Sequence, residues 1–226
     1  MDIGPIDPNI TSLEIARKTT KGSRGVYVEF IEGMGQDLGK LLRGKVNDKG
    51  VDSVSILDAL HEIRNDEDKR IILENMAGIL KPEGTFVFNS AFTTEAIRNS
   101  PREWAKWKIT AMDILGRKRN KEVPTLPIHS PEKYREMIRN AGLEVVHEAT
   151  KVVNLTKRAL GAIAMYPEFV RGVFEDMQDQ DKFSLQQKSS ALRQALTENN
   201  VSFLPRIWFE VIARKPTGST VLFSAV

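Results

Sequence analysis

The segment from Val51 to Phe92 constrains the fold more than any other part of the chain. An apolar run, Val54–Leu57, leads into a polar turn and then into a helix with apolar residues at i, i+4, i+7 and i+8 from Ile72. The Pro-x-Gly sequence at Pro82 is expected to end this helix, and residues Thr85–Asn89 to form a second strand. A strand, helix and strand of these lengths predict a right-handed parallel crossover.

Polar side chains follow the first strand of this crossover directly. Asp58, His61 and Glu62 come just after Leu57. Ligands of open α/β sheets bind outside the carboxyl ends of the strands. The segment therefore predicts a place for chemistry as well as a fold.

Strands and helices alternate along most of the chain. We expect strands near 3–7, 26–31, 143–153 and 206–213, and helical segments near 11–20, 94–119, 130–141 and 155–200. The first helix is expected to be capped by Thr11 or Ser12, whereas residues 123–127 read as extended. This alternation predicts an α/β fold with a mainly parallel sheet.

The composition is that of a single globular domain, with 226 residues, 41% hydrophobic and 28% charged. Cysteine is absent, which excludes disulfides, cysteine-bound metal centres and thiol nucleophiles and fits a reducing, cytoplasmic location. No apolar run approaches the roughly 18 residues of a membrane span, and the first residues lack a signal-peptide pattern.

The net charge of +3 is spread along the chain, because acidic residues interleave with Lys and Arg. This pattern favours a solvated surface over a nucleic-acid footprint, which needs a concentrated basic patch. The three histidines are scattered without metal-ligand spacing, so no metal site is expected.

Six segments resemble, in order, the second to seventh strands and adjoining helices of class I S-adenosylmethionine (SAM)-dependent methyltransferases. They are IDPNITSLEIARK, VEFIEGMGQDL, VSILDALHEI, LKPEGTFVF, SPEKYREMIRNAGLEVV and RIWFEVIARKP. The resemblance implies a Rossmann-like domain over residues 1–215, with helical insertions at about 94–122 and 155–200 that could form a lid, and a tail at 216–226.

The resemblance is incomplete at the amino end. The family's first strand and glycine-rich loop should precede Asp7, where this sequence has six residues. We therefore expect an N-terminally incomplete fold, favour truncation over natural degeneracy, and expect exposed sheet edges and an exposed apolar face. Met34 also replaces the Asp or Asn that usually binds the adenine amino group in this family.

The resemblance implies a SAM site made of six residues. Asp7 would accept hydrogen bonds from the ribose hydroxyls, although an Asp before proline is also typical of a turn. Met34 and Gly35 would line the adenine, or form an ordinary turn. Asp37 could bind the adenine amino group or lie in solvent.

Two further cofactor residues, Leu57 and Asp58, would border the methyl donor, with a capping role as the alternative for Asp58. His61 would be the catalytic general base toward a hydroxyl or amine, because its ordinary pKa lies near working pH. The alternative is a histidine that packs at the cofactor's edge without transferring a proton. Apolar residues would line the acceptor pocket or simply pack in a core: Trp104, Trp107, Met165, Tyr166, Phe169 and Phe174.

The function implied is transfer of a methyl group from SAM to a small-molecule acceptor by O-, N- or C-methylation. One alternative is a non-catalytic methyltransferase-like module that binds a partner protein, and a weaker one is an RNA methyltransferase. The inserted helices favour a bulky apolar or amphiphilic acceptor, and a homodimer stays open as the assembly.

Overall fold

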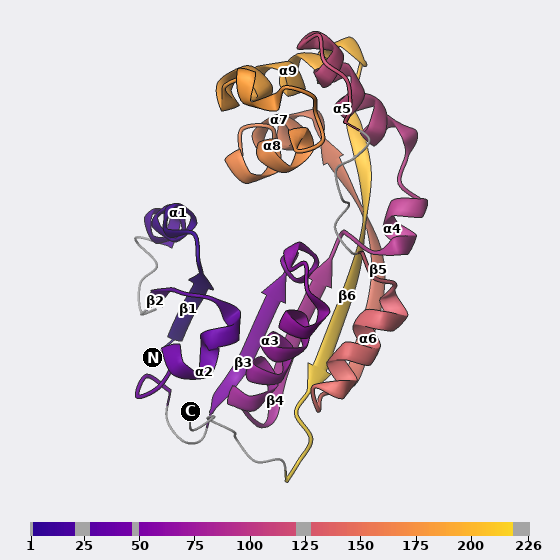
Figure 1. Cartoon of the computed structure of the whole chain (residues 1–226). Coiled ribbons are helices and arrows are strands. Elements are labelled where there is room, and N and C mark those ends of the chain that lie inside the picture. Colours follow the sequence, from indigo (N-terminus) through magenta and orange to yellow (C-terminus); the bar gives the residue numbers. More distant parts are fainter. Residues whose placement is uncertain (1, 21–27, 47–49, 121–127, 219–226) are drawn as a thin grey trace. The chain divides into compact units, whose positions relative to one another are not determined.

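The computed structural model describes residues 2–20, 28–46, 50–120 and 128–218 (Figure 1). Their contacts divide the chain into two compact units. The first unit comprises Met1–Asn89, Glu132–Glu148 and Glu210–Val226, and the second comprises Ser90–Pro131 and Ala149–Phe209. The single domain over 1–215 stays a prediction.

A two-stranded parallel sheet begins the first unit. It pairs β1 (Asp2–Asp7) with β2 (Val28–Glu32), and α1 (Ile10–Thr20) connects them. The expectation that Thr11 or Ser12 caps α1 is wrong. Asn9 does so, because its Oδ1 accepts hydrogen bonds from the backbone amides of both residues, at 3.0 and 3.3 Å. After β2, a 3₁₀ turn, η1 (Gly35–Asp37), leads into α2 (Leu38–Leu41).

A four-stranded sheet, in the order β3-β4-β6-β5, runs through this unit, and parts of β5 and β6 belong to the second unit. The strands are β3 (Val51–Leu57), β4 (Leu80–Ser90), β6 (Phe203–Arg214) and β5 (Glu144–Thr156). The predicted crossover is confirmed, since β3 and β4 are parallel neighbours joined through η2 (Leu60–Glu62) and α3 (Asp66–Ile79).

Helix α3 ends earlier than expected. Asn65 caps it by accepting a hydrogen bond from the Glu67 amide at 2.9 Å. The helix ends at Ile79, and β4 already includes Pro82, so the proline is not the stop. Lys215 Nζ donates to the carbonyls of Gly78 and Leu80 at the helix end.

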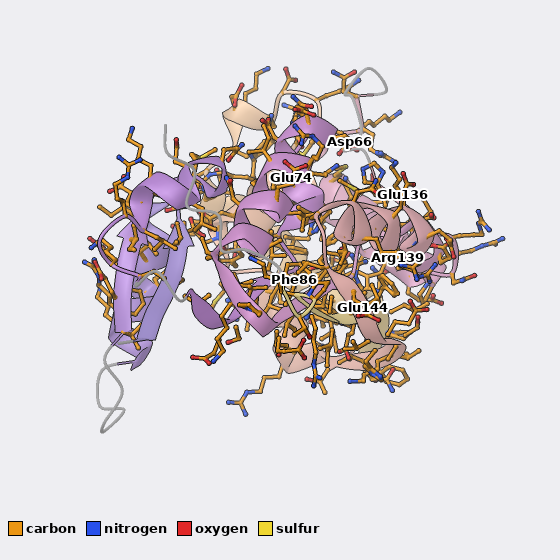
Figure 2. The ribbon with its side chains drawn as sticks, turned by 90° about the horizontal axis from the view of Figure 1, so that it is seen from below. Asp66, Glu74, Phe86, Glu136, Arg139 and Glu144 are labelled. Atoms are coloured by element: carbon orange, nitrogen blue, oxygen red, sulfur yellow. The ribbon has the colours of Figure 1, made fainter. Side chains whose placement is uncertain are left out.

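Helices cover one face of this sheet. Phe86 and Phe88 of β4 are fully buried there, and Phe88 packs on Tyr134 of α6 (Pro131–Asn140) at a ring-centroid distance of 5.0 Å. Figure 2 shows charged side chains of α3 and α6 at the outside, with Phe86 lying between the elements. Gly142, at a φ of 84°, lies just past the end of α6, in the left-handed conformation typical of a residue after a helix end.

The face opposite these helices is less covered. Val87 of β4 is only half-buried there, and Leu57 and Ile212 are 55% and 37% exposed. This face of the sheet therefore carries exposed apolar residues, as expected.

The second unit is built largely from helices around its own core. Its helical elements are α4 (Thr94–Arg98), α5 (Arg102–Ile114), α7 (Lys157–Ile163), α8 (Pro167–Phe174), η3 (Gln180–Lys182) and α9 (Leu185–Glu198). The expected helical stretch 94–119 is divided, because α5 starts only after Pro101. Trp107, Phe174 and Leu192 belong to the core, and Trp107 Nε1 donates to the Leu192 carbonyl at 2.7 Å.

Two expectations concern other parts of the chain. The extended segment 123–127 lies outside the described residues. Within the described ranges, none of the helices combines the length and apolarity needed to cross a bilayer.

Candidate cofactor site

The carboxyl end of β1 presents Asp7. One carboxylate oxygen of Asp7 accepts a hydrogen bond from the Asn9 amide at 2.7 Å, which holds the turn into α1. The Asp7 carbonyl accepts one from the Gly33 amide at 3.2 Å, which joins this strand end to the loop after β2. Its second carboxylate oxygen accepts no hydrogen bond from the part of the chain that the structure describes. Asp7 therefore holds a turn and also has acceptor capacity for a ligand.

The loop after β2 carries Met34, Gly35 and Asp37. Met34 is 47% exposed, and Asp37 belongs to η1. Gly35 approaches Ile72 of α3 so closely that an added Cβ would lie 3.1 Å from the Ile72 side chain. A side chain at Gly35 would therefore require Ile72 or the loop to shift by a few tenths of an ångström.

Asn75 also attaches this loop to α3, which the sequence analysis missed. Its Nδ2 donates to the Gln36 carbonyl at 2.7 Å and to the Gly35 carbonyl at 3.4 Å. The sequence did contain a signal for this contact, because Asn75 is a polar residue next to Met76 on the apolar face of the helix. Ile72 and Asn75 together fix the loop on which the adenine contacts were predicted.

The carboxyl ends of β3 and β4 meet at Asp58 and Asn89. Asp58 has a φ of 48°, in the left-handed region that few non-glycine residues adopt. Its amide donates to both the carbonyl oxygen and the side-chain Oδ1 of Asn89, at 3.0 and 2.9 Å. The sequence analysis placed Asn89 at the end of a strand and gave it no further role. Its polar side chain at that strand end was the signal for a contact with the neighbouring strand end.

His61 lies close to Asp58 but is buried. Its Nδ1 is 3.9 Å from Asp58 Oδ1, and 4% of its side chain is exposed against 34% for Asp58. Asp58 is therefore the more accessible member of this pair. Direct contact between the acceptor and His61 requires access that this conformation does not provide, so its role as catalytic base stays a prediction.

The predicted site residues form two groups within the first unit. Asp7, Met34, Gly35 and Asp37 surround the small sheet, whereas Leu57, Asp58 and His61 follow β3 of the larger sheet. Helix α3 links the groups, because it follows η2 in the chain and contacts the loop after β2.

The predicted acceptor-pocket residues lie in the second unit. Trp107 and Phe174 are buried in its core, Trp104 and Phe169 pack against that core, and Met165 and Tyr166 are 59% and 46% exposed. Among the described residues, no group of three or more His, Asp or Glu side chains could hold a metal ion.

Comparison with solved structures identifies the fold. A Bacillus halodurans protein assigned as a methyltransferase aligns with 96% of this chain and 84% of its own, at a TM-score of 0.56 and 12% identity. A SAM-dependent methyltransferase of Methanosarcina mazei aligns over 95% and 81%, at a TM-score of 0.52 and 12% identity. The fold is that of the class I SAM-dependent methyltransferases.

A third methyltransferase-fold structure, at a TM-score of 0.51 and 20% identity, comes from Haloferax volcanii. It is a complex of the Trm112 methyltransferase activator and a protein assigned as a methyltransferase, and it covers 96% of this chain and 72% of its own. No protein-family model and no curated protein sequence matches the chain. The methyltransferase fold thus rests on structural likeness at low sequence identity.

Proposed function

We propose that this protein binds SAM and transfers its methyl group to a small-molecule acceptor. The observation that carries the proposal is the pairing of Asp58 with Asn89 at the adjoining carboxyl ends of two parallel strands, in a methyltransferase fold. Ligands of open α/β sheets occupy this edge. The absence of cysteine suits a cytoplasmic location, where we place the activity.

The residues present fit the chemistry of the cofactor. Asp7 offers a carboxylate oxygen for the ribose hydroxyls, and Met34 offers an exposed thioether for the adenine. Leu57 is an exposed apolar residue at the end of β3, suited to the methionine side of the cofactor. Asp37 would bind the adenine amino group in place of the acid that Met34 replaces.

When bound, SAM supplies an electrophilic methyl group on a sulfonium sulfur. The chain's contribution is to position the acceptor and exclude water, because an in-line displacement needs alignment more than a reactive side chain. The proton of an O–H or N–H acceptor goes to the Asp58–His61 pair, in which the Asp58 carboxylate faces the acceptor. The buried His61 lies beside that carboxylate, with its Nδ1 3.9 Å from Asp58 Oδ1.

The proposal is tested by calorimetric titration of the chain with SAM, together with Asp7→Ala and the matched control Asp68→Ala on α3. We expect the parent and the control to bind SAM equally. Asp7→Ala should bind at least about tenfold more weakly, because it loses a hydrogen bond to a charged carboxylate. Lack of SAM binding by the folded parent would overturn the proposal. Equal binding by Asp7→Ala would overturn only the ribose assignment.

A second candidate function is a non-catalytic module that binds a partner protein. Met34 favours it, since the family's adenine-binding acid is missing there, and the exposed apolar Leu57 offers surface for a protein contact. SAM binding without release of S-adenosylhomocysteine, across acceptors of several chemical classes, would favour this function over catalysis.

A further inference from the structure

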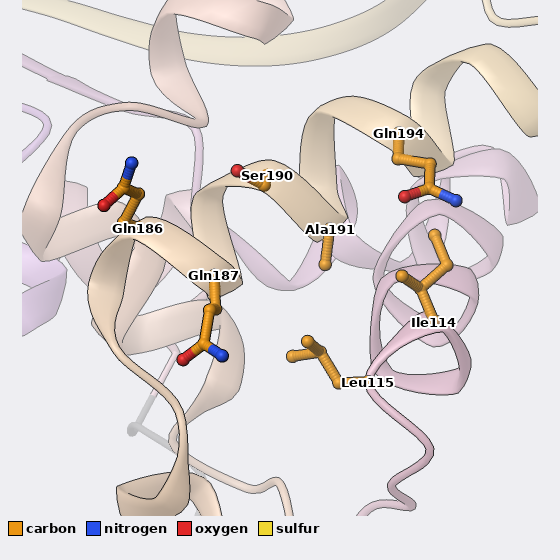
Figure 3. Close-up of a pocket in the computed structure, with 7 residues that line it drawn as sticks. All are labelled: Ile114, Leu115, Gln186, Gln187, Ser190, Ala191 and Gln194. Carbon is orange, nitrogen blue, oxygen red and sulfur yellow. The ribbon is translucent and has the colours of Figure 1, made fainter.

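Two hollows lie side by side along α9 in the second unit. The first, of about 320 Å³, is bordered by Ile114 and Leu115 at the end of α5 and by amide side chains of α9 (Figure 3). The second, of about 630 Å³, lies between α7 and α9. Ser190 and Gln194 line both hollows, so they adjoin along one helix. We call the two together the α9 surface.

The second hollow is basic. Lys157 and Arg158 at the start of α7 and Arg193 of α9 line it, and all three are exposed. None of these three side chains has an ion pair with a carboxylate anywhere in the described ranges. Three unpaired cations around one hollow create a positive potential that attracts an anionic partner.

The acidic residues nearest in the chain do not neutralise these cations. Helix α7 contains no acid, and Glu198 is the one acid of α9. Glu198 accepts a hydrogen bond from Gln194 at 2.8 Å, and Glu168 of α8 is paired with Arg171 at 3.2 Å. The three cations of the hollow are therefore available to pair with carboxylates of another molecule.

The first hollow supplies an apolar contact beside this charge. Ile114 and Leu115 are partly buried against the core of the unit, which fixes them in place. In the second hollow, Gly161 and Ala162 let another backbone approach closely, and Met165 is 59% exposed at its border. Apolar and cationic contacts next to each other match an amphipathic segment that has both apolar and acidic side chains.

We propose that the α9 surface is a docking site for an acidic amphipathic helix of a partner protein. Apolar residues of that helix contact Ile114 and Leu115, and its carboxylates pair with Lys157, Arg158 and Arg193. The lining of the two hollows contains no aromatic residue on which a nucleobase could stack. Its concave form also suits a helix better than a flat lipid surface.

The test is fluorescence anisotropy with a labelled synthetic helix that has leucines along one face and glutamates along the other. The 226-residue chain is compared with the charge-reversed variant Lys157→Glu/Arg158→Glu/Arg193→Glu and with Ser190→Trp, which fills the junction of the hollows. The matched control reverses three exposed cations elsewhere: Lys40→Glu, Lys106→Glu and Arg139→Glu. Circular dichroism checks that all variants are folded.

We expect the parent to bind the peptide with an affinity that falls as salt is raised. The charge-reversed variant and Ser190→Trp should each bind at least about tenfold more weakly, and the control within about twofold of the parent. Equal losses in the control and the α9 variant would overturn the proposal. It would also be overturned if polyuridylate or phosphatidylserine vesicles bound at this surface while the peptide did not.

Discussion

Asn89 holds Asp58 in place at the edge where β3 and β4 end. The Asp58 amide donates to two oxygens of the same residue, the Asn89 carbonyl at 3.0 Å and Oδ1 at 2.9 Å. Asp58 has a positive φ of 48°, so this contact offsets a backbone conformation that is unfavourable for an L-residue. The arrangement fixes the carboxylate proposed to face the acceptor.

We predict that Asn89→Ala lowers the free energy of unfolding by about 1 kcal/mol, because the Oδ1 acceptor is lost while the carbonyl remains. It should also weaken SAM binding, since Asp58 loses part of its support. Urea denaturation and calorimetry measure the two effects. Asn140→Ala, an exposed asparagine at the end of α6, is the control and should change neither.

We predict that a glycine variant at Asp58 is more stable than an alanine variant, which is the reverse of the order at an ordinary helical site. Asp58→Gly should be more stable than Asp58→Ala by about 1 kcal/mol, because glycine adopts a positive φ without strain. At Glu74 in the interior of α3, Glu74→Gly should be less stable than Glu74→Ala by about the same amount. Urea denaturation of the four variants tests this, and the same order at both sites would contradict it.

The crossover from β3 to β4 could be predicted because its determinants are local. The Asn65 cap and the spacing of Ile72, Met76 and Ile79 act within a few turns of one helix. The helix end could not be predicted in the same way. The end of α3 bonds to Lys215, which is 135 residues away from Leu80 in the sequence.

The candidate site was predictable in position but not in detail. Leu57 ends an apolar run and Asp58 follows it, so their place at a strand end is visible in the sequence. The burial of His61 and the contact of Asn75 with Gln36 arise only when separate elements pack together. No local pattern specifies them.

We predict that Trp107 is a principal stabilising residue of the second unit. Trp107→Ala should lower the free energy of unfolding by about 3 to 5 kcal/mol, since it leaves a cavity and removes the bond to the Leu192 carbonyl. Ile109→Ala, on the same helix but 47% exposed, should cost less than about 1 kcal/mol. Thermal or urea unfolding measures both. Similar losses would show that Trp107 is not a core residue in solution.

We predict that Lys215 makes stability rise with pH in the alkaline range. Burial lowers the pKa of its ammonium group from the ordinary value of 10.5. Between the lowered pKa and 10.5, the unfolded chain binds a proton that the folded protein does not, so the free energy of unfolding rises with pH. Below the lowered pKa both states are protonated and this contribution is constant.

The Lys215→Met variant tests this pH dependence. Its free energy of unfolding should lack the alkaline rise, whereas the control Lys106→Met, at an exposed lysine, should keep it. Urea denaturation at several pH values from roughly 8 to 11 gives the slopes. Identical slopes in the parent and Lys215→Met would contradict a lowered pKa, even if the variant is less stable at every pH.

Finally, we predict that the backbone amides of β3 are protected from hydrogen exchange along only one edge of the strand. Among the described strands, β4 has neighbours on both sides, whereas β3 pairs with β4 only. The β3 amides that point away from β4 should therefore exchange with solvent much faster than those of β4 around Phe86 and Phe88. Hydrogen exchange followed by NMR measures each amide, with β5, the other outer strand, as the internal comparison. Strong protection of every β3 amide would contradict the prediction and would mean that another strand covers this edge in solution.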